Sequence, residues 1–181
     1  MPSPAYDLVI RGGTLATATD VFAADLGIRG ERIAAIGLDL PAGAQEIDAS
    51  GKLVLPGGVD THCHIEQLSG GGLMNADSFE TATRSAAFGG TTSVISFAAQ
   101  HREKNLAEVV ADYAKLARKG AIIDYAFHLM VANPDEQTIG TDLPALISAG
   151  HRSVKLFMTY DAVQVEDGQL LDVLVAARGA G

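Results

Sequence analysis

Short apolar stretches broken by glycine and polar residues dominate the first part of the chain. Residues 6–10, 21–29, 32–36 and a short piece around 46–48 are each typical of a β-strand, since Gly, Asp and Pro separate them. We expect Arg11, Gly12 and Gly13 to close the first strand. Residues 1–55 therefore predict the N-terminal part of a small, sandwich-like β domain.

After Pro56 the hydrophobic pattern changes, and apolar strands alternate with helices. The expected strands are 59–65, 91–98, 122–131 and 153–158. The expected helices are 78–88, 106–117, 143–149 and 169–178. Asp77 is the expected N-cap of the first helix, with Glu80 three residues later, and a glycine follows each helix.

This alternation determines the expected fold class. Near-continuous apolar strands that alternate with helices predict an α/β fold with parallel strands and crossover helices. A doubly wound sheet and a TIM-type barrel both fit, but no Gly-x-Gly-x-x-Gly follows a strand, so a dinucleotide-binding version has no support. A closed barrel needs roughly 200 or more residues. In a TIM-type (β/α)8 barrel, residues 56–181 would hold only the first four strand–helix units, so that barrel would be incomplete.

Composition narrows the classes of partner. Hydrophobic residues make up 48% of the 181 positions and charged residues 19%, which is ample for a core. The net charge of −9, without a basic cluster, would be repelled by a phosphate backbone, so nucleic acid is not an expected partner. No stretch approaches the ~20 apolar residues of a membrane span, and the N-terminus lacks the pattern of a secretion signal. We therefore expect a cytoplasmic protein without a membrane partner.

The sharpest local feature is the pair of histidines that ends the first barrel-type strand. Residues two apart in a strand face the same way, so His62 and His64 present two imidazoles on one face. Barrel active sites are built at this end of the strands, and two neutral imidazoles are a natural start for a zinc site. The alternative is a chance pair at a strand end. Cys63 alternates away from the imidazoles and is expected to be a packed residue.

A second feature is Lys155, in the middle of the apolar strand 153–158. Burial lowers the pKa of a lysine and makes its amine nucleophilic, so that it adds CO₂ to form a carbamate. Such a carbamate is a two-oxygen anion able to bridge two metal ions. The alternative is a lysine whose amine reaches the barrel rim or pairs with a carboxylate.

Several separated motifs together resemble the amidohydrolase superfamily, and within it the dihydropyrimidinase/D-hydantoinase family. The stretch VLPGGVDTHCH at 54–64 is similar to the metal-binding signature of the superfamily. The stretch SVKLFMTY at 153–160 is similar to the carboxylated-lysine strand of dihydropyrimidinases and hydantoinases. DLVIRGG at 7–13, AAFGGTT at 86–92 and DYAFH at 124–128 also fit, so the resemblance covers nearly the whole chain.

The resemblance implies a site and a reaction. His62 and His64 would bind one of two zinc ions, carboxylated Lys155 would bridge both, and Tyr160 would hydrogen-bond the oxyanion of the tetrahedral intermediate. The reaction would be hydrolysis of cyclic amides such as dihydropyrimidines and hydantoins. The complete protein would be a homo-oligomer, a tetramer. The two further histidines and the aspartate that the family uses would follow Gly181, so we expect the chain to be an N-terminal portion that is inactive by itself.

Alternatives remain at this point. A non-catalytic, dihydropyrimidinase-like scaffold protein and another cyclic amidohydrolase, such as allantoinase, share the resemblance. A carboxylate at Glu66 would repel an acidic ring, which weakens a dihydroorotase interpretation. The other histidines are not expected to replace the missing ligands. His101 is expected in a solvated loop, His151 on the surface after a helix, and His128 inside a strand as a satisfied core residue or a support for the site.

Overall fold

A computed structural model describes residues 3–69 and 71–181 of the chain. It divides into two compact units, Met1–Pro56 and Gly57–Gly181. Each unit contains one β-sheet, and the helices all belong to the second unit. No helix in these described ranges is long and apolar enough to cross a membrane.

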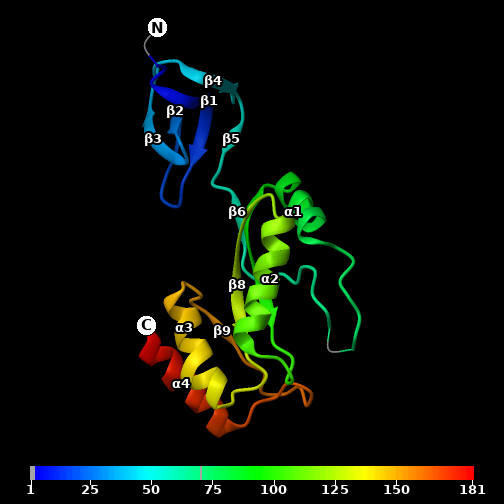
Figure 1. Cartoon of the computed structure of the whole chain (residues 1–181). Coiled ribbons are helices and arrows are strands. Elements are labelled where there is room, and N and C mark those ends of the chain that lie inside the picture. Colours follow the sequence, from blue (N-terminus) through cyan, green and yellow to red (C-terminus); the bar gives the residue numbers. More distant parts are fainter. Residues whose placement is uncertain (1–2, 70) are drawn as a thin grey trace. The chain divides into compact units, whose positions relative to one another are not determined.

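The first unit is a five-stranded mixed sheet (Figure 1). Its strands are β1 (Tyr6–Ala16), β2 (Val21–Arg29), β3 (Arg32–Gly37), β4 (Gly43–Asp48) and β5 (Leu53–Val54). Strands β1, β2 and β3 are antiparallel neighbours, whereas β4 and β5 run parallel to β1. Leu15, Ala24 and Leu26 form its buried apolar cluster.

Strand β1 is longer than expected, because the Gly12–Gly13 pair makes a bulge instead of an end. The register with β2 shifts between Ile10 and Gly13, and Gly12 has a φ of 64°. The carboxylate of Asp25 accepts a hydrogen bond from the Gly12 N–H at 2.9 Å and pairs with Arg11 at 3.0 Å. The pKa of Asp25 lies below its usual value, mainly because the carboxylate accepts the Gly12 N–H. Smaller contributions in the same direction come from the Leu40 N–H and the Arg11 guanidinium.

The second unit is a parallel sheet in the order β6-β7-β8-β9 with helices between the strands (Figure 1). The strands are β6 (Gly58–Asp60), β7 (Thr91–Ala99), β8 (Asp124–Met130) and β9 (Val154–Lys155). The helices are α1 (Phe79–Phe88), α2 (Leu106–Gly120), α3 (Leu143–Ser148) and α4 (Asp167–Ala180), with a π-turn, Thr138–Asp142, before α3. Four strand–helix units in this order make half of a barrel, as the alternation predicts.

Several element boundaries in the second unit differ from the expectation, and three of them lie in or near the histidine segment and Lys155. The first strand ends at Asp60 rather than at residue 65, and the fourth contains two residues rather than six. Both are outer strands of the sheet, so each has a pairing partner on one side only. Helix α1 begins after Ser78, not Asp77, because the Ser78 hydroxyl accepts the Thr81 N–H while the Thr81 hydroxyl accepts the Ser78 N–H.

Glycine at position 57 is required by the close approach of the chain to β7. A Cβ atom at Gly57 would lie 2.1 Å from the hydroxyl oxygen of Thr92. The N–H of the adjacent Gly58 donates to the Gly90 carbonyl at 2.8 Å. The glycines thus let β6 pair tightly with β7 and carry the chain toward His62.

Candidate active site

The two faces of the parallel sheet have different surroundings. One face packs against the helices, with Val94, Phe127 and Leu129 in the main apolar core. The other face carries a smaller cluster of Phe97, Ala99 and Met130, against which Phe157 and Val163 pack. Strand alternation produces this division, because residues two apart share a face.

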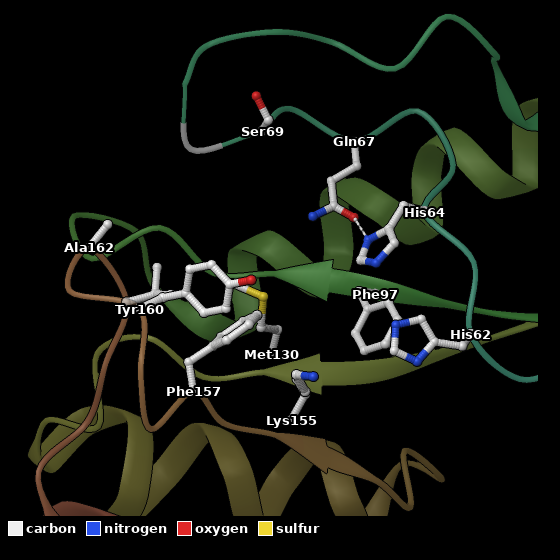
Figure 2. Close-up of a pocket in the computed structure, with 11 residues that line it drawn as sticks. His62, His64, Gln67, Ser69, Phe97, Met130, Lys155, Phe157, Tyr160 and Ala162 are labelled. Atoms are coloured by element: carbon white, nitrogen blue, oxygen red, sulfur yellow. Dashed lines mark hydrogen bonds between the residues drawn. The ribbon is translucent and has the colours of Figure 1, made fainter.

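The second face holds a pocket of about 470 Å³ (Figure 2). It brings together the four residues that the sequence analysis assigns to the site. The residues that line it are His62, His64, Gln67, Ser69, Phe97, Met130, Lys155, Phe157, Tyr160, Ala162 and Val163.

The histidine pair lies in an irregular segment directly after β6. The Asp60 carboxylate accepts the His62 N–H at 3.0 Å, and the Cys63 N–H donates to the Ile95 carbonyl of β7 at 3.5 Å. Side chains in this segment therefore still point alternately to the two faces of the sheet, although the segment is not part of a strand. The two imidazole centres are 5.6 Å apart, with their planes at 67°, while Cys63 packs against the helix-side core.

Phe97 of β7 is the common neighbour of three imidazoles. Its ring centre lies 4.7 Å from those of His62 and His64 and 4.9 Å from that of His128. The His64 ring is stacked on Phe97, with 13° between the planes. Phe97 is buried, so the exposed imidazoles lie on a fixed apolar base.

Lys155 reaches the same pocket from β9. Its Nζ lies 4.8 Å from the centre of the Phe157 ring, a cation–π contact (Figure 2). The side chain is half-buried, not fully buried as the strand pattern predicted, because β9 is an outer strand of the sheet.

Tyr160 lies on the loop that follows β9. Its ring makes an edge contact with Phe157 at 5.2 Å between centres, and its side chain is 65% exposed. The guanidinium of Arg102, from the loop after β7, donates to the carbonyls of Ala162 and Gln164 at 2.9 and 2.7 Å. Arg102 thereby connects the loop after β7 to the loop that carries Tyr160 and Ala162.

The remaining histidines lie outside the pocket lining. His128 has both ring nitrogens bonded, to the Ser153 hydroxyl and, at 2.8 Å, to the Thr61 carbonyl. Since a carbonyl only accepts, Nε2 of His128 donates the proton, and the ring ties β8 to the histidine segment. His101 and His151 are both half-buried, which differs from the exposed positions expected for them.

Glu66 does not line the pocket. Its carboxylate accepts the N–H of Phe79 at 2.9 Å, in the first turn of α1. The positive end of a helix stabilises a carboxylate there. The inference that Glu66 repels acidic rings is therefore not supported, because this carboxylate is engaged elsewhere.

Cys63 has the properties of a packed residue rather than a nucleophile. Burial, and after it the charge of Asp60, raises the pKa of its thiol to about 11. A thiol with such a pKa is almost entirely protonated at neutral pH and is a poor nucleophile.

Comparison with known proteins identifies the family. No family model matches the chain. A curated D-hydantoinase from Geobacillus stearothermophilus is 42% identical over 176 residues, which are 96% of this chain. A solved structure of a D-hydantoinase superposes with a TM-score of 0.91 at 40% identity over 97% of the chain. The chain belongs to the D-hydantoinase/dihydropyrimidinase family.

The match has a clear extent. The chain corresponds to the N-terminal portion of the D-hydantoinases and spans 37–38% of their length. The same family includes mouse Dihydropyrimidinase-related protein 5, which is 33% identical over 99% of this chain. The fold class expected from the sequence, a β segment followed by half of a parallel barrel, is confirmed by this superposition.

The pocket contains part of the ligand set for one metal ion. Two imidazoles bound to one tetrahedral zinc at about 2 Å have ring centres roughly 5 Å apart, close to the observed 5.6 Å. Lys155 offers an oxygen ligand only as a carbamate. Among residues 3–69 and 71–181, no group of three or more His, Cys, Asp or Glu side chains is placed to hold a metal. Apart from a Lys155 carbamate, the described residues therefore offer no ligand set for the second ion of a two-metal site.

Several pocket residues were not identified from the sequence. Phe97, Met130 and Phe157 share the face of Lys155, and Ala99, Met130 and Lys155 pair across β7, β8 and β9. Counting alternate positions in each strand would have found them. Gln67 carries no such signal, because it lies in a loop whose conformation depends on long-range contacts.

Proposed function

We propose that this chain supplies the first half of the active site of a metal-dependent cyclic amidohydrolase. Its substrates would be hydantoins or dihydropyrimidines, and the reaction would be hydrolysis of a ring amide. The observation that carries the proposal is the single pocket shared by His62, His64, Lys155 and Tyr160. The names of the relatives, D-hydantoinase and dihydropyrimidinase, support this substrate class.

His62 and His64 would hold one zinc ion through ring nitrogens, and Lys155 would connect it to a second. For that, the lone pair of neutral Nζ bonds to the carbon of CO₂, and the nitrogen releases one proton to water. The product is a carbamate anion with two oxygen donors. Bound zinc supplies Lewis acidity toward the ring carbonyl and lowers the pKa of water.

The other pocket residues would orient the substrate. The phenolic O–H of Tyr160 would donate a hydrogen bond to the carbonyl oxygen as it gains negative charge. The edge contact with Phe157 restricts the Tyr160 ring, which favours a fixed position for that hydroxyl. Phe97 and Met130 give the pocket an apolar base that excludes water from the reacting ring.

The whole activity belongs to a longer protein, because the chain spans under two fifths of its D-hydantoinase relatives. We expect the purified 181-residue chain with added zinc to show no significant turnover of hydantoin or dihydrouracil. We also expect it to associate through the unpaired edges of β6 and β9. Robust turnover by the chain alone would contradict this part of the proposal.

A chimera tests the function directly. Residues 1–181 would replace the homologous segment of the Geobacillus D-hydantoinase, and hydantoin ring opening and bound zinc would be measured. We expect an active chimera whose Lys155→Ala variant loses both metal and activity, with partial recovery in bicarbonate and a short-chain acid. Lys115→Ala, on the exposed face of α2, is the matched control. A Lys155→Ala chimera that keeps two zinc ions per chain would refute the role of Lys155.

A non-catalytic scaffold is the second candidate, because Dihydropyrimidinase-related protein 5 matches over 99% of the chain. The retention of His62, His64 and Lys155 in one pocket favours the enzyme. A chimera that folds and assembles but binds no zinc would favour the scaffold instead.

A further inference from the structure

Between the histidine pair and α1, residues 65–69 and 71–77 form two antiparallel arms that are hydrogen-bonded to each other at their base. The Glu66 N–H donates to the Asp77 carbonyl at 3.2 Å, and the Glu66 carboxylate accepts from Phe79. One step further in, the Gln67 N–H donates to the Asn75 side chain at 2.9 Å, and the Asn75 N–H donates to the Gln67 carbonyl at 3.1 Å. The main chain of Gln67 is therefore held from both directions.

The side chain of Gln67 is hydrogen-bonded to His64. Its Oε1 lies 2.7 Å from Nδ1 of the imidazole, and Figure 2 shows this bond with the other ring nitrogen turned away from Gln67. The stack on Phe97 defines the plane of the His64 ring. The bond to Gln67 then determines which edge of the ring faces the two arms, so the two contacts together determine the orientation.

The chemistry of this bond determines where the His64 proton lies. An amide oxygen only accepts, so Nδ1 must carry the proton, and Nε2 of the neutral ring then has a free lone pair. If the amide were reversed, its NH₂ group would donate to Nδ1, and the proton would lie on Nε2. The orientation of one amide therefore decides whether Nε2 of His64 is able to bind a metal ion.

We propose that Gln67 is a positioning residue that holds His64 in the tautomer with a free Nε2 directed at the metal site. This inference rests on the proposed function only for the assumption that the site to which Nε2 points binds a metal ion. Partners that orient a metal-binding histidine are most often carboxylates or carbonyls, and their loss typically costs 10–100-fold in metal affinity. Gln67 performs this role without adding a negative charge beside the ion.

Nitrogen NMR of the metal-free chain tests the tautomer without any catalytic assay. Long-range proton–nitrogen correlations of the histidine rings would be recorded at mildly alkaline pH, where imidazole is neutral. A His64→Ala variant would assign the signals. We expect the proton of His64 on Nδ1 in the natural chain and in Gln67→Glu, which keeps an acceptor oxygen. In Gln67→Met, a substitution of similar size without an acceptor, we expect a mixture of both tautomers.

Zinc titration of the same proteins gives a second measurement. We expect Gln67→Met to bind zinc about 10–100-fold more weakly, and Gln67→Glu to retain its affinity. Gln164→Met is the matched control, because Gln164 is an exposed glutamine of the Tyr160 loop whose side chain has no bond to an imidazole in the described structure.

The outcomes separate the two proposals. A His64 proton on Nε2 in the natural chain, or a Gln67→Met protein identical to Gln164→Met in both measurements, would overturn the role of Gln67. The expected tautomers in a chain that binds no zinc would support the positioning by Gln67 and count against the metal site of the proposed function.

Discussion

Replacement of Phe97 by leucine should loosen the candidate site and destabilise the second unit together. Aromatic pairs at such distances contribute about 0.5–1.5 kcal/mol each beyond area burial. Phe97 contacts His62, His64 and His128. Because His62 and His64 are exposed, we take about 0.5 kcal/mol for each of these two pairs and about 1 kcal/mol for the pair with His128, which gives about 2 kcal/mol. The smaller leucine in a buried position adds roughly 1 kcal/mol. We expect a total destabilisation of about 3 kcal/mol.

Hydrogen exchange of the β7 and β8 amides measures this change in the second unit alone. Phe88→Leu is the matched control, since Phe88 is 89% exposed at the end of α1 and should change stability by less than about 0.5 kcal/mol. The mobility of the His62 and His64 rings should increase only in Phe97→Leu. If both variants gave the same exchange rates, the argument that the imidazoles depend on Phe97 would be refuted.

Three further predictions follow from other contacts. Arg102→Ala should speed amide exchange in residues 157–165, because it removes two charge-assisted bonds to that loop; unchanged exchange would contradict the link. Folding lowers the pKa of Asp25, so the ionised carboxylate stabilises the folded state. This stabilisation is fully present above the pKa of the unfolded chain, about 3.9, and is lost as the pH falls through the pKa of the folded chain. Urea midpoints against pH should therefore fall in acid less steeply in Asp25→Asn, which is less stable at neutral pH, and equal slopes would refute this. With a thiol pKa of about 11, Cys63 should react slowly with iodoacetamide near neutral pH until the chain is unfolded; fast reaction of the folded chain would show the thiol to be accessible and ionised.

The alternation of residues along each strand allowed part of the candidate site to be predicted. His62 and His64 face one way and Cys63 the other, because the period of two persists even where β6 has ended. Lys155 reaches the same pocket because parallel strands present their alternate positions on a common face. The four strand–helix units were predictable for the same reason, since their hydrophobic periodicity is a local property.

The sequence by itself therefore determined which face of the sheet carries the imidazoles and the amine, because side-chain direction within a strand depends only on position. The tertiary structure alone decided what surrounds them. Glu66 binds the start of α1 rather than the pocket, and Gln67 reaches His64 because its arm pairs with residues 71–77. Arg102 holds the Tyr160 loop from 60 residues away. Hydrogen bonds of this kind depend on the meeting of distant segments in space, which no local periodicity encodes.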